Sequence, residues 1–239
     1  MLPQRLDEPD FASLGQSALR RMVRAGEAMI EAEKRLGKAG HSLVERMLDG
    51  HGSFEPWAHY PPEDVYDYDT ASQYYYHAHT DRPEEHGHFH LFLRETALSS
   101  SAAPRRDLGT EGGAIAHVVA ISMNRMGHPL ELFVTNGWVT AEDAYGADDL
   151  IEALPQWGVD HTQPCLAVNQ WLTAAVRFFR PQIELLIRAR DAALEPLAAK
   201  SGWEEVLELR DIEVVARMPV SPEAQMREII GLLGGGPPI

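Results

Sequence analysis

Five histidines within fourteen residues are the part of this sequence best suited to chemistry; they are His77, His79, His86, His88 and His90. Side chains alternate across a β-strand, so histidines two residues apart share a face. If the two segments pair as an antiparallel hairpin around residues 80–85, His79 lies opposite His86 and His77 lies opposite His88. Tyr75 then lies opposite His90. We therefore expect all five imidazoles on one face of the hairpin.

Neutral imidazoles are common ligands of transition metals, and two to four convergent ring nitrogens at about 2.0–2.1 Å suffice. The sequence thus predicts one transition metal ion, either iron, zinc or copper, bound by His77, His79, His86, His88 and His90. Gln73 and Tyr75 continue the same face and are predicted to hold a small-molecule substrate. A carboxylate ligand could come from Glu84 or Glu85 in the loop, or from Glu131 on a later strand.

These ligands suit several functions, and the sequence leaves the choice open. We expect a small-molecule metalloenzyme of oxygenase-type or hydrolytic chemistry, with the surplus histidines in supporting or acid–base roles. A metal-binding, sensing or storage protein would use the same residues with every coordination position filled. A histidine-rich surface hairpin that binds nothing specific is a further alternative.

Two short motifs suggest other chemistry. The string from His86 to Phe92, HGHFHLF, resembles the histidine-triad motif of nucleotide hydrolases and transferases, which implies His88 as a nucleophile. It differs from that family at Gly87, where a bulky apolar residue is usual. The HAH segment ending at His79, followed by Glu84, is similar to the first metal motif of cupins, whereas the second cupin motif is missing from the sequence.

Over most of its length the chain resembles a bacterial protein family of unknown function. Three segments carry this resemblance: QYYYHAH at 73–79, HGHFHLF at 86–92 and LFVTNGWVT at 132–140. The resemblance implies no activity, cofactor or partner.

Hydrophobic periodicity indicates an α+β fold, in which a small antiparallel sheet with a histidine-rich hairpin is flanked by N-terminal and C-terminal helices. Strands are predicted at about 67–79, 86–95, 114–123 and 130–136, with one more near 212–218. On the hairpin, Tyr74, Tyr76, Phe89, Leu91 and Leu93 form the face opposite the histidines, which is predicted to pack on the core. Asp10 is the expected cap of a long first helix, and Thr140–Asp143 has the spacing of a helix start.

The whole chain, 1–239, is predicted to be a single α+β domain. Its parts are a flexible arm at 1–9, a helical cap at 10–50, an antiparallel β region at 51–140, a helical region with one further strand at 141–233, and a tail at 234–239. Residues 51–66 are interpreted as an ordered loop, and Pro181 should kink or split a long C-terminal helix. The helical cap is expected to cover the domain's own core, with a homodimer interface as the alternative.

The amino-acid composition argues against several kinds of binding partner. Acidic residues number 36 against 21 lysines and arginines, for a formal charge of −15, which argues against binding to nucleic acid or anionic membranes. No apolar run is long enough for a membrane span, and the N-terminus does not read as a signal peptide. The single cysteine, Cys165, is expected to be structural and fits a reducing, cytoplasmic location. His117 and His128 are taken as ordinary polar residues, and His59 is given no role.

Overall fold

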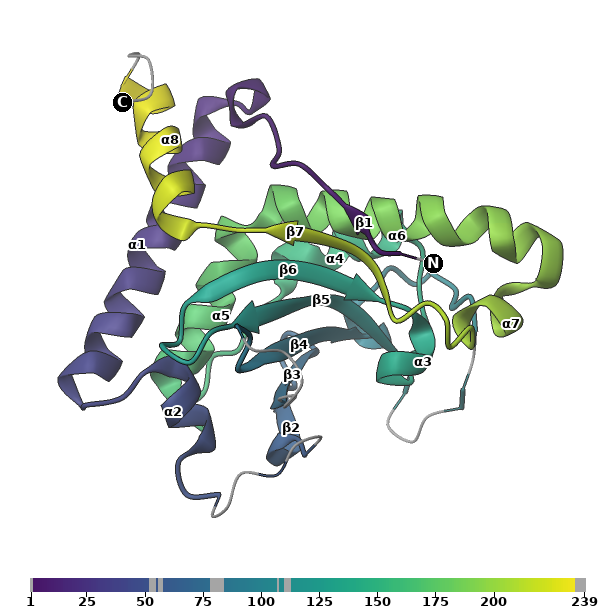
Figure 1. The fold of residues 1–239 in the computed structure, drawn as a ribbon, viewed down its shortest axis with the longest axis horizontal. Coiled ribbons are helices and arrows are strands. Elements are labelled where there is room, and N and C mark those ends of the chain that lie inside the picture. Colours follow the sequence, from purple (N-terminus) through teal and green to yellow (C-terminus); the bar gives the residue numbers. More distant parts are fainter. Residues whose placement is uncertain are drawn as a thin grey trace.

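A single continuous β-sheet organises the molecule (Figure 1). The computed structural model describes residues 2–51, 55, 58–77, 84–106, 108–109 and 113–234. Its seven strands follow the order β1-β7-β6-β5-β4-β3-β2 across the sheet. Their bounds are Gln4–Arg5 (β1), Tyr60–Asp67 (β2), Ser72–His77 (β3), Gly87–Arg94 (β4), Ile115–Met123 (β5), Pro129–Thr135 (β6) and Val214–Pro219 (β7). Neighbouring strands are antiparallel except for β1 and β7, which are parallel.

The helices fall into three groups along the chain. Those before it are α1 (Gln16–Lys38) and α2 (Leu43–Leu48). Those between β6 and β7 are α3 (Gly137–Thr140), α4 (Ala147–Ala153), α5 (Leu166–Phe178), α6 (Arg180–Ser201) and α7 (Trp203–Leu207), and α8 (Pro222–Gly234) follows β7. Short 3-10 turns occupy Phe11–Ser13, Glu95–Ala97 and Leu154–Gln156. Pro181 falls in the first turn of α6, where its missing N–H costs no helical bond, so the predicted split between α5 and α6 is confirmed.

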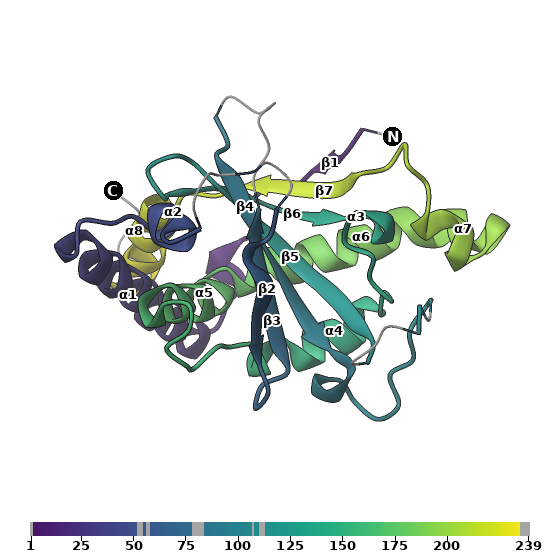
Figure 2. The same cartoon turned by 90° about the horizontal axis from the view of Figure 1, so that it is seen from below.

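One face of the sheet packs on these helices and forms the main core. Tyr74, Tyr76, Phe89, Leu91 and Leu93 belong to the same buried apolar cluster as residues of α1, α5 and α6. Helix α6 contacts β5, β6 and β7, while α1 packs along α5 and α8. Figure 2 shows α1 beside α5, and α4 and α6 along the sheet. The prediction that this side of the hairpin faces the core is confirmed, which leaves the histidines for the opposite side.

The expected small antiparallel sheet is wrong in extent and in type. The sheet has seven strands and is mixed, because Gln4–Arg5, assigned to a flexible arm, pairs in parallel with β7. Residues 51–66 were expected to form a loop, yet β2 begins at Tyr60. Pro61 and Pro62 cannot donate backbone hydrogen bonds, but β2 is the edge strand and has one neighbour only, so prolines are tolerated there.

Two predicted helix starts are also corrected. Asp10 caps the 3-10 turn Phe11–Ser13 through its side chain, and α1 begins later, at Gln16. The segment Thr140–Asp143 ends a helix instead of beginning one, because α3 stops at Thr140 and Ala141 takes a left-handed conformation with φ 50°. The carboxylate of Asp143 accepts the backbone N–H groups of Leu108 and Ile115. The Asp143 side chain therefore binds backbone N–H groups outside a helix.

Candidate metal centre

Strands β3 and β4 bring part of the histidine-rich sequence together. His77 lies opposite His88 and Tyr75 lies opposite His90, which confirms the predicted register at these positions. Directly opposed side chains share a face and lie roughly 4.5–5.5 Å apart, so the rings converge. One ring nitrogen from each of His77, His88 and His90 lies within 4.8 Å of the other two. We call these three residues the histidine cluster.

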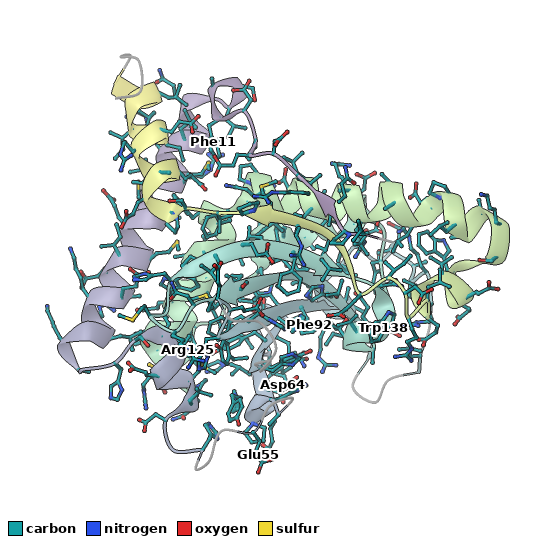
Figure 3. All side chains as sticks on the ribbon, viewed as in Figure 1. Phe11, Glu55, Asp64, Phe92, Arg125 and Trp138 are labelled. Carbon is teal, nitrogen blue, oxygen red and sulfur yellow. The ribbon has the colours of Figure 1, made fainter. Side chains whose placement is uncertain are left out.

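The histidine cluster lies largely out of contact with solvent. His88 and His90 are 2% and 1% exposed, and His77 is half-buried. Ring centroids within the cluster are 4.5 to 5.5 Å apart. Phe133 meets His88 edge-on at 5.2 Å, and Phe92 lies 6.2 Å from His90. Figure 3 labels Phe92 together with Asp64, which borders the same face. Aromatic walls of this kind lower the local dielectric around any bound ion.

Glu85 orients the imidazole of His88. Its Oε1 lies 2.6 Å from His88 Nδ1, and its Oε2 accepts the Ser122 hydroxyl at 3.0 Å. An ionised carboxylate only accepts hydrogen bonds, so His88 donates from Nδ1 and its Nε2 carries the lone pair. A carboxylate that accepts from one ring nitrogen in this way is a usual outer partner of a metal-binding imidazole. Glu85, considered from the sequence as a possible metal ligand, is therefore placed here as a hydrogen-bond partner of His88.

His117 plays the corresponding part for His90. His90 Nδ1 and His117 Nε2 are 3.0 Å apart, and His117 Nδ1 lies 3.4 Å from the Thr135 hydroxyl. When His90 donates, His117 accepts on Nε2 and keeps its own proton on Nδ1, facing Thr135. His90 then has its lone pair on Nε2, as a metal ligand requires. One consistent set of tautomers therefore prepares both buried histidines for a metal.

A β-bulge explains how His117 reaches this face. Ala120 pairs with His90, so simple alternation along β5 would place Val118 on the side of the histidine cluster. The register shifts between Leu91 and Phe92, and Phe92 pairs with His117 instead. A bulge adds one residue to one strand and so exchanges the faces of the residues beyond it. The interpretation of His117 as an ordinary polar residue missed this contact.

Burial favours the neutral form of these imidazoles. It is the main cause that holds the pKa of His90 well below its ordinary 6.5, and the neighbouring His88 and His117 add to it. Burial, followed by the charge of Arg190, lowers the pKa of His117 to about 3. A metal binds the neutral imidazole, so burial keeps His90 in the form that coordination needs. It keeps His117, the partner of His90, neutral as well.

The two remaining predicted ligands are His79 and His86. His79 lies outside the described residues. The ring of His86 stacks on Tyr76, with its Nδ1 2.8 Å from the Tyr76 hydroxyl. Tyr76 belongs to the core on the other side of the sheet, so this contact gives no support to His86 as a ligand, and that role stays a prediction. His86 precedes β4 and is not bound by strand alternation.

The predicted substrate residues lie beside the cluster. Tyr75 stacks on His59 at 3.7 Å, and its hydroxyl has no hydrogen-bond partner among the described residues. Gln73 is engaged at both ends, because its amide donates to Asp64 at 2.7 Å and its carbonyl accepts from Arg94 at 3.0 Å. Asp64 also holds His59 Nδ1 at 2.8 Å. Tyr75 thus keeps a polar group available for a ligand, whereas Gln73 serves the surrounding network.

Sequence reasoning gave no role to His59 or to Glu142. His59 precedes β2 and comes within 6.3 Å of the His77 ring. Glu142 accepts the backbone N–H of His117 at 2.6 Å, and burial is the main cause that raises its carboxyl pKa to about 7. Neither residue lies in a recognisable motif. Their placement depends on a strand and a chain reversal that local patterns did not reveal.

These observations define the protein as a mixed α/β protein with a histidine cluster on the sheet face opposite its helices. The chain belongs to the family described as Domain of unknown function (DUF6969), which matches residues 23–220. This confirms the expected membership of a family of unknown function. No curated protein and no solved structure shows significant similarity to the chain. None of the described helices combines the length and apolar character that a membrane span needs.

Proposed function

We propose that this protein binds one transition metal ion through His77, His88 and His90 and acts as a metalloenzyme on a small molecule. The observation that carries the proposal is the convergence of three imidazole nitrogens within 4.8 Å of one another. Nitrogens bound at about 2.0–2.1 Å around a tetrahedral ion lie about 3.4 Å apart. Small rotations of the rings would shorten the distances between the nitrogens from up to 4.8 Å to this value. His77 is only half-buried, so its ring has room to rotate.

The partners of the cluster support a metal more than a set of ordinary polar residues. Glu85 and His117 each engage one Nδ1, and both contacts are buried. Three imidazoles packed for structure alone would not need a carboxylate on one and a further imidazole on another. Outer partners that fix tautomer and orientation are what metal-binding histidines require.

Three protein ligands favour catalysis over storage. Structural and storage sites fill the coordination sphere with protein groups, whereas catalytic sites keep a position for water or substrate. Tyr75 lies 5.1 Å from the His90 ring and offers its hydroxyl to a ligand there. Phe92 and Phe133 supply apolar surface. The metal, once bound, would supply Lewis acidity or redox chemistry, which the same ligands allow for zinc, iron or copper.

Two alternatives use the same residues. A sensing or storage protein would add a fourth protein ligand, for which His79 is the sequence candidate. A nucleotide hydrolase or transferase would use His88 as nucleophile without a metal. The first alternative predicts a bound metal without an open coordination position, and the second predicts no metal. The proposed enzyme has a bound metal with an open position.

The test is elemental analysis of protein purified without an affinity tag and without added metal. We expect about one equivalent of iron, copper or zinc, lost in the His77→Ala/His88→Ala double variant and kept in His41→Ala, a histidine outside the cluster. Cobalt(II) substitution then reports coordination, because an added anion such as azide changes the visible spectrum only if a position is open. An unchanged metal content in the double variant would sink the proposed site. A site that ignores azide would favour sensing or storage.

A further inference from the structure

A groove on the helical side of the molecule gathers arginines in an otherwise acidic chain. It lies between α1, the start of α6 and the turn at Leu154–Pro155, and has a volume of about 540 Å³. Arg21, Arg24, Arg177 and Arg180 line it, and no carboxylate does so among the described residues. We call this the arginine groove. The whole chain has 36 acidic residues and 21 basic ones, so this grouping runs against its overall charge.

Two of these arginines have no internal partner. Arg24 and Arg177 make no hydrogen bond or ion pair with any other described residue, and both are exposed. Arg21 donates to the Ser17 hydroxyl at 2.7 Å, and Arg180 pairs with Glu184 at 2.6 Å. Like charges three residues apart on a helix, such as Arg21 and Arg24, repel one another. An anion in the groove would relieve this repulsion and supply the missing partners.

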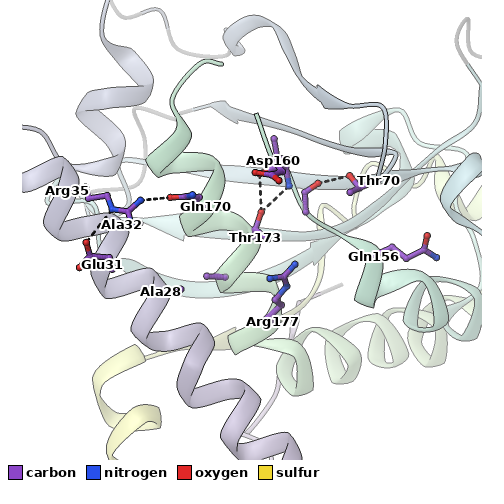
Figure 4. Close-up of a pocket in the computed structure, with 13 residues that line it drawn as sticks. Ala28, Glu31, Ala32, Arg35, Thr70, Gln156, Asp160, Gln170, Thr173 and Arg177 are labelled. Carbon is purple, nitrogen blue, oxygen red and sulfur yellow. Dashed lines mark hydrogen bonds and ion pairs between the residues drawn. The ribbon is translucent and has the colours of Figure 1, made fainter. Parts of the chain in front are cut away.

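A second pocket continues from the arginine groove. It has a volume of about 590 Å³ and shares Ala28, Ala174 and Arg177 with the groove. Figure 4 shows Arg177 among the residues that line this second pocket, with no dashed line to the other residues drawn. Small side chains of α1 and α5, namely Ala28, Ala32 and Ala174, form part of its wall. We call this the polar pocket.

The polar pocket offers hydrogen bonds without a net charge. Glu31 and Asp160 balance Arg35 and Arg177, and the remaining polar groups are Thr70, Gln156, Gln170 and Thr173. Arg35 is held by Glu31 at 3.3 Å and by Gln170 at 2.8 Å. No aromatic ring lines either cavity among the described residues, so neither provides a stacking platform for a nucleobase. The hydroxyl groups of a ligand suit this polar lining better than a nucleobase does.

We infer that the arginine groove and the polar pocket together bind a sugar phosphate. The phosphate lies among Arg21, Arg24, Arg177 and Arg180, whose planar guanidinium groups match phosphate oxygens in pairs. The sugar hydroxyls lie in the polar pocket, near Thr173 and Asp160. Each of the two cavities, at about 540 and 590 Å³, falls within the size range of small-molecule sites. This site is separate from the histidine cluster, which lies on the other face of the sheet.

The test is titration calorimetry at low salt with inorganic phosphate, ribose 5-phosphate and glucose 6-phosphate as probes. At least one sugar phosphate should bind more tightly than inorganic phosphate. Arg24→Gln/Arg177→Gln should weaken that binding about tenfold or more, because the phosphate loses two charged hydrogen-bond donors. Neither substitution removes a hydrogen bond or ion pair among the described residues, so both variants should fold. Arg188→Gln is the matched control, because Arg188 is exposed and pairs with Asp148 outside both cavities.

Other outcomes overturn the inference in distinct ways. No saturable binding of any probe, or equal binding by the double variant and wild type, would remove the arginine groove as an anion site. Inorganic phosphate binding as tightly as both sugar phosphates would remove the role of the polar pocket. Loss of binding in His77→Ala/His88→Ala would assign the phosphate to a metal in the histidine cluster. Preferential binding to phosphatidylserine vesicles would assign the arginines to a membrane surface.

Discussion

Glu85 accepts a hydrogen bond from His88 Nδ1 at 2.6 Å, and both side chains are buried. The second Glu85 oxygen accepts from Ser122, whose strand position is directly opposite His88. The carboxylate therefore bridges two neighbouring strands while it fixes one imidazole. Its negative charge also increases the basicity of the ring nitrogen that would face a metal.

Glu85→Gln should lower metal affinity about 10- to 100-fold, as is typical when an outer carboxylate partner is changed. The amide can still meet His88 Nδ1, but it lacks the charge that strengthens Nε2 as a ligand. Competition with a chromophoric chelator measures the affinity. Glu84→Gln is the control, because Glu84 is the adjacent carboxylate and is exposed. Equal affinities for the two variants would show that Glu85 is purely structural.

His117 makes a second outer contact, through His90, that can be tested in the same assay. His117→Phe keeps an aromatic ring but removes the acceptor for His90 Nδ1, so metal affinity should fall about tenfold. His117→Gln retains a carbonyl acceptor and should recover part of the loss. Circular dichroism confirms that each variant folds. Wild-type affinity in His117→Phe would show that His90 needs no partner for its orientation.

The histidine face could be predicted only where local alternation determines it. His77, His88 and His90 lie within two paired strands, so the period of two was sufficient to bring them together. His117 could not be placed, because a bulge between Leu91 and Phe92 exchanges the faces of β5 and leaves no clear signal in composition. His86 lies before β4, where the alternation does not apply.

The extent of the sheet was likewise set by contacts distant in sequence. Gln4 and Arg5 have no strand pattern of their own and pair with β7 more than 200 residues later, beside Ala216 and Arg217. The local sequence of β2 argues against a strand, because it contains two prolines. They are tolerated because β2 lies at the edge of the sheet. Helices α5 and α6 were predictable, because periodicity and Pro181 act locally.

Gly87 has a packing role that stability measurements can reveal. A Cβ at this position would lie 2.5 Å from both the His77 carbonyl oxygen and the Tyr76 hydroxyl. Gly87→Ala should therefore destabilise the fold by about 1–3 kcal/mol, the usual cost of overpacking. Gly37→Ala is the control, since nothing lies within 4 Å of its added Cβ, and in a helix it should stabilise by about 0.5–1 kcal/mol. Urea unfolding measures both, and equal effects would contradict the packing argument.

Glu142 should make stability depend on pH in an unusual direction. Burial is the main cause that raises its carboxyl pKa from 4.5 to about 7 in the folded protein. Between these values the folded state binds more protons than the unfolded state, so this group favours folding at low pH. Its contribution is lost as pH rises through 7, at up to about 1.4 kcal/mol per pH unit.

Glu142→Gln should remove this dependence, because the amide oxygen can still accept the His117 N–H and carries no charge at any pH. The free energy of unfolding, measured by urea titration from pH 5 to pH 8, should therefore rise in the variant relative to wild type as pH increases. Other titrating groups cancel in this difference. Glu204→Gln, which changes an exposed carboxylate in α7, should leave the wild-type profile unchanged. Parallel profiles for Glu142→Gln and wild type would show that Glu142 is ionised throughout and is stabilised by Arg190 and Arg106, whose charges lower its carboxyl pKa.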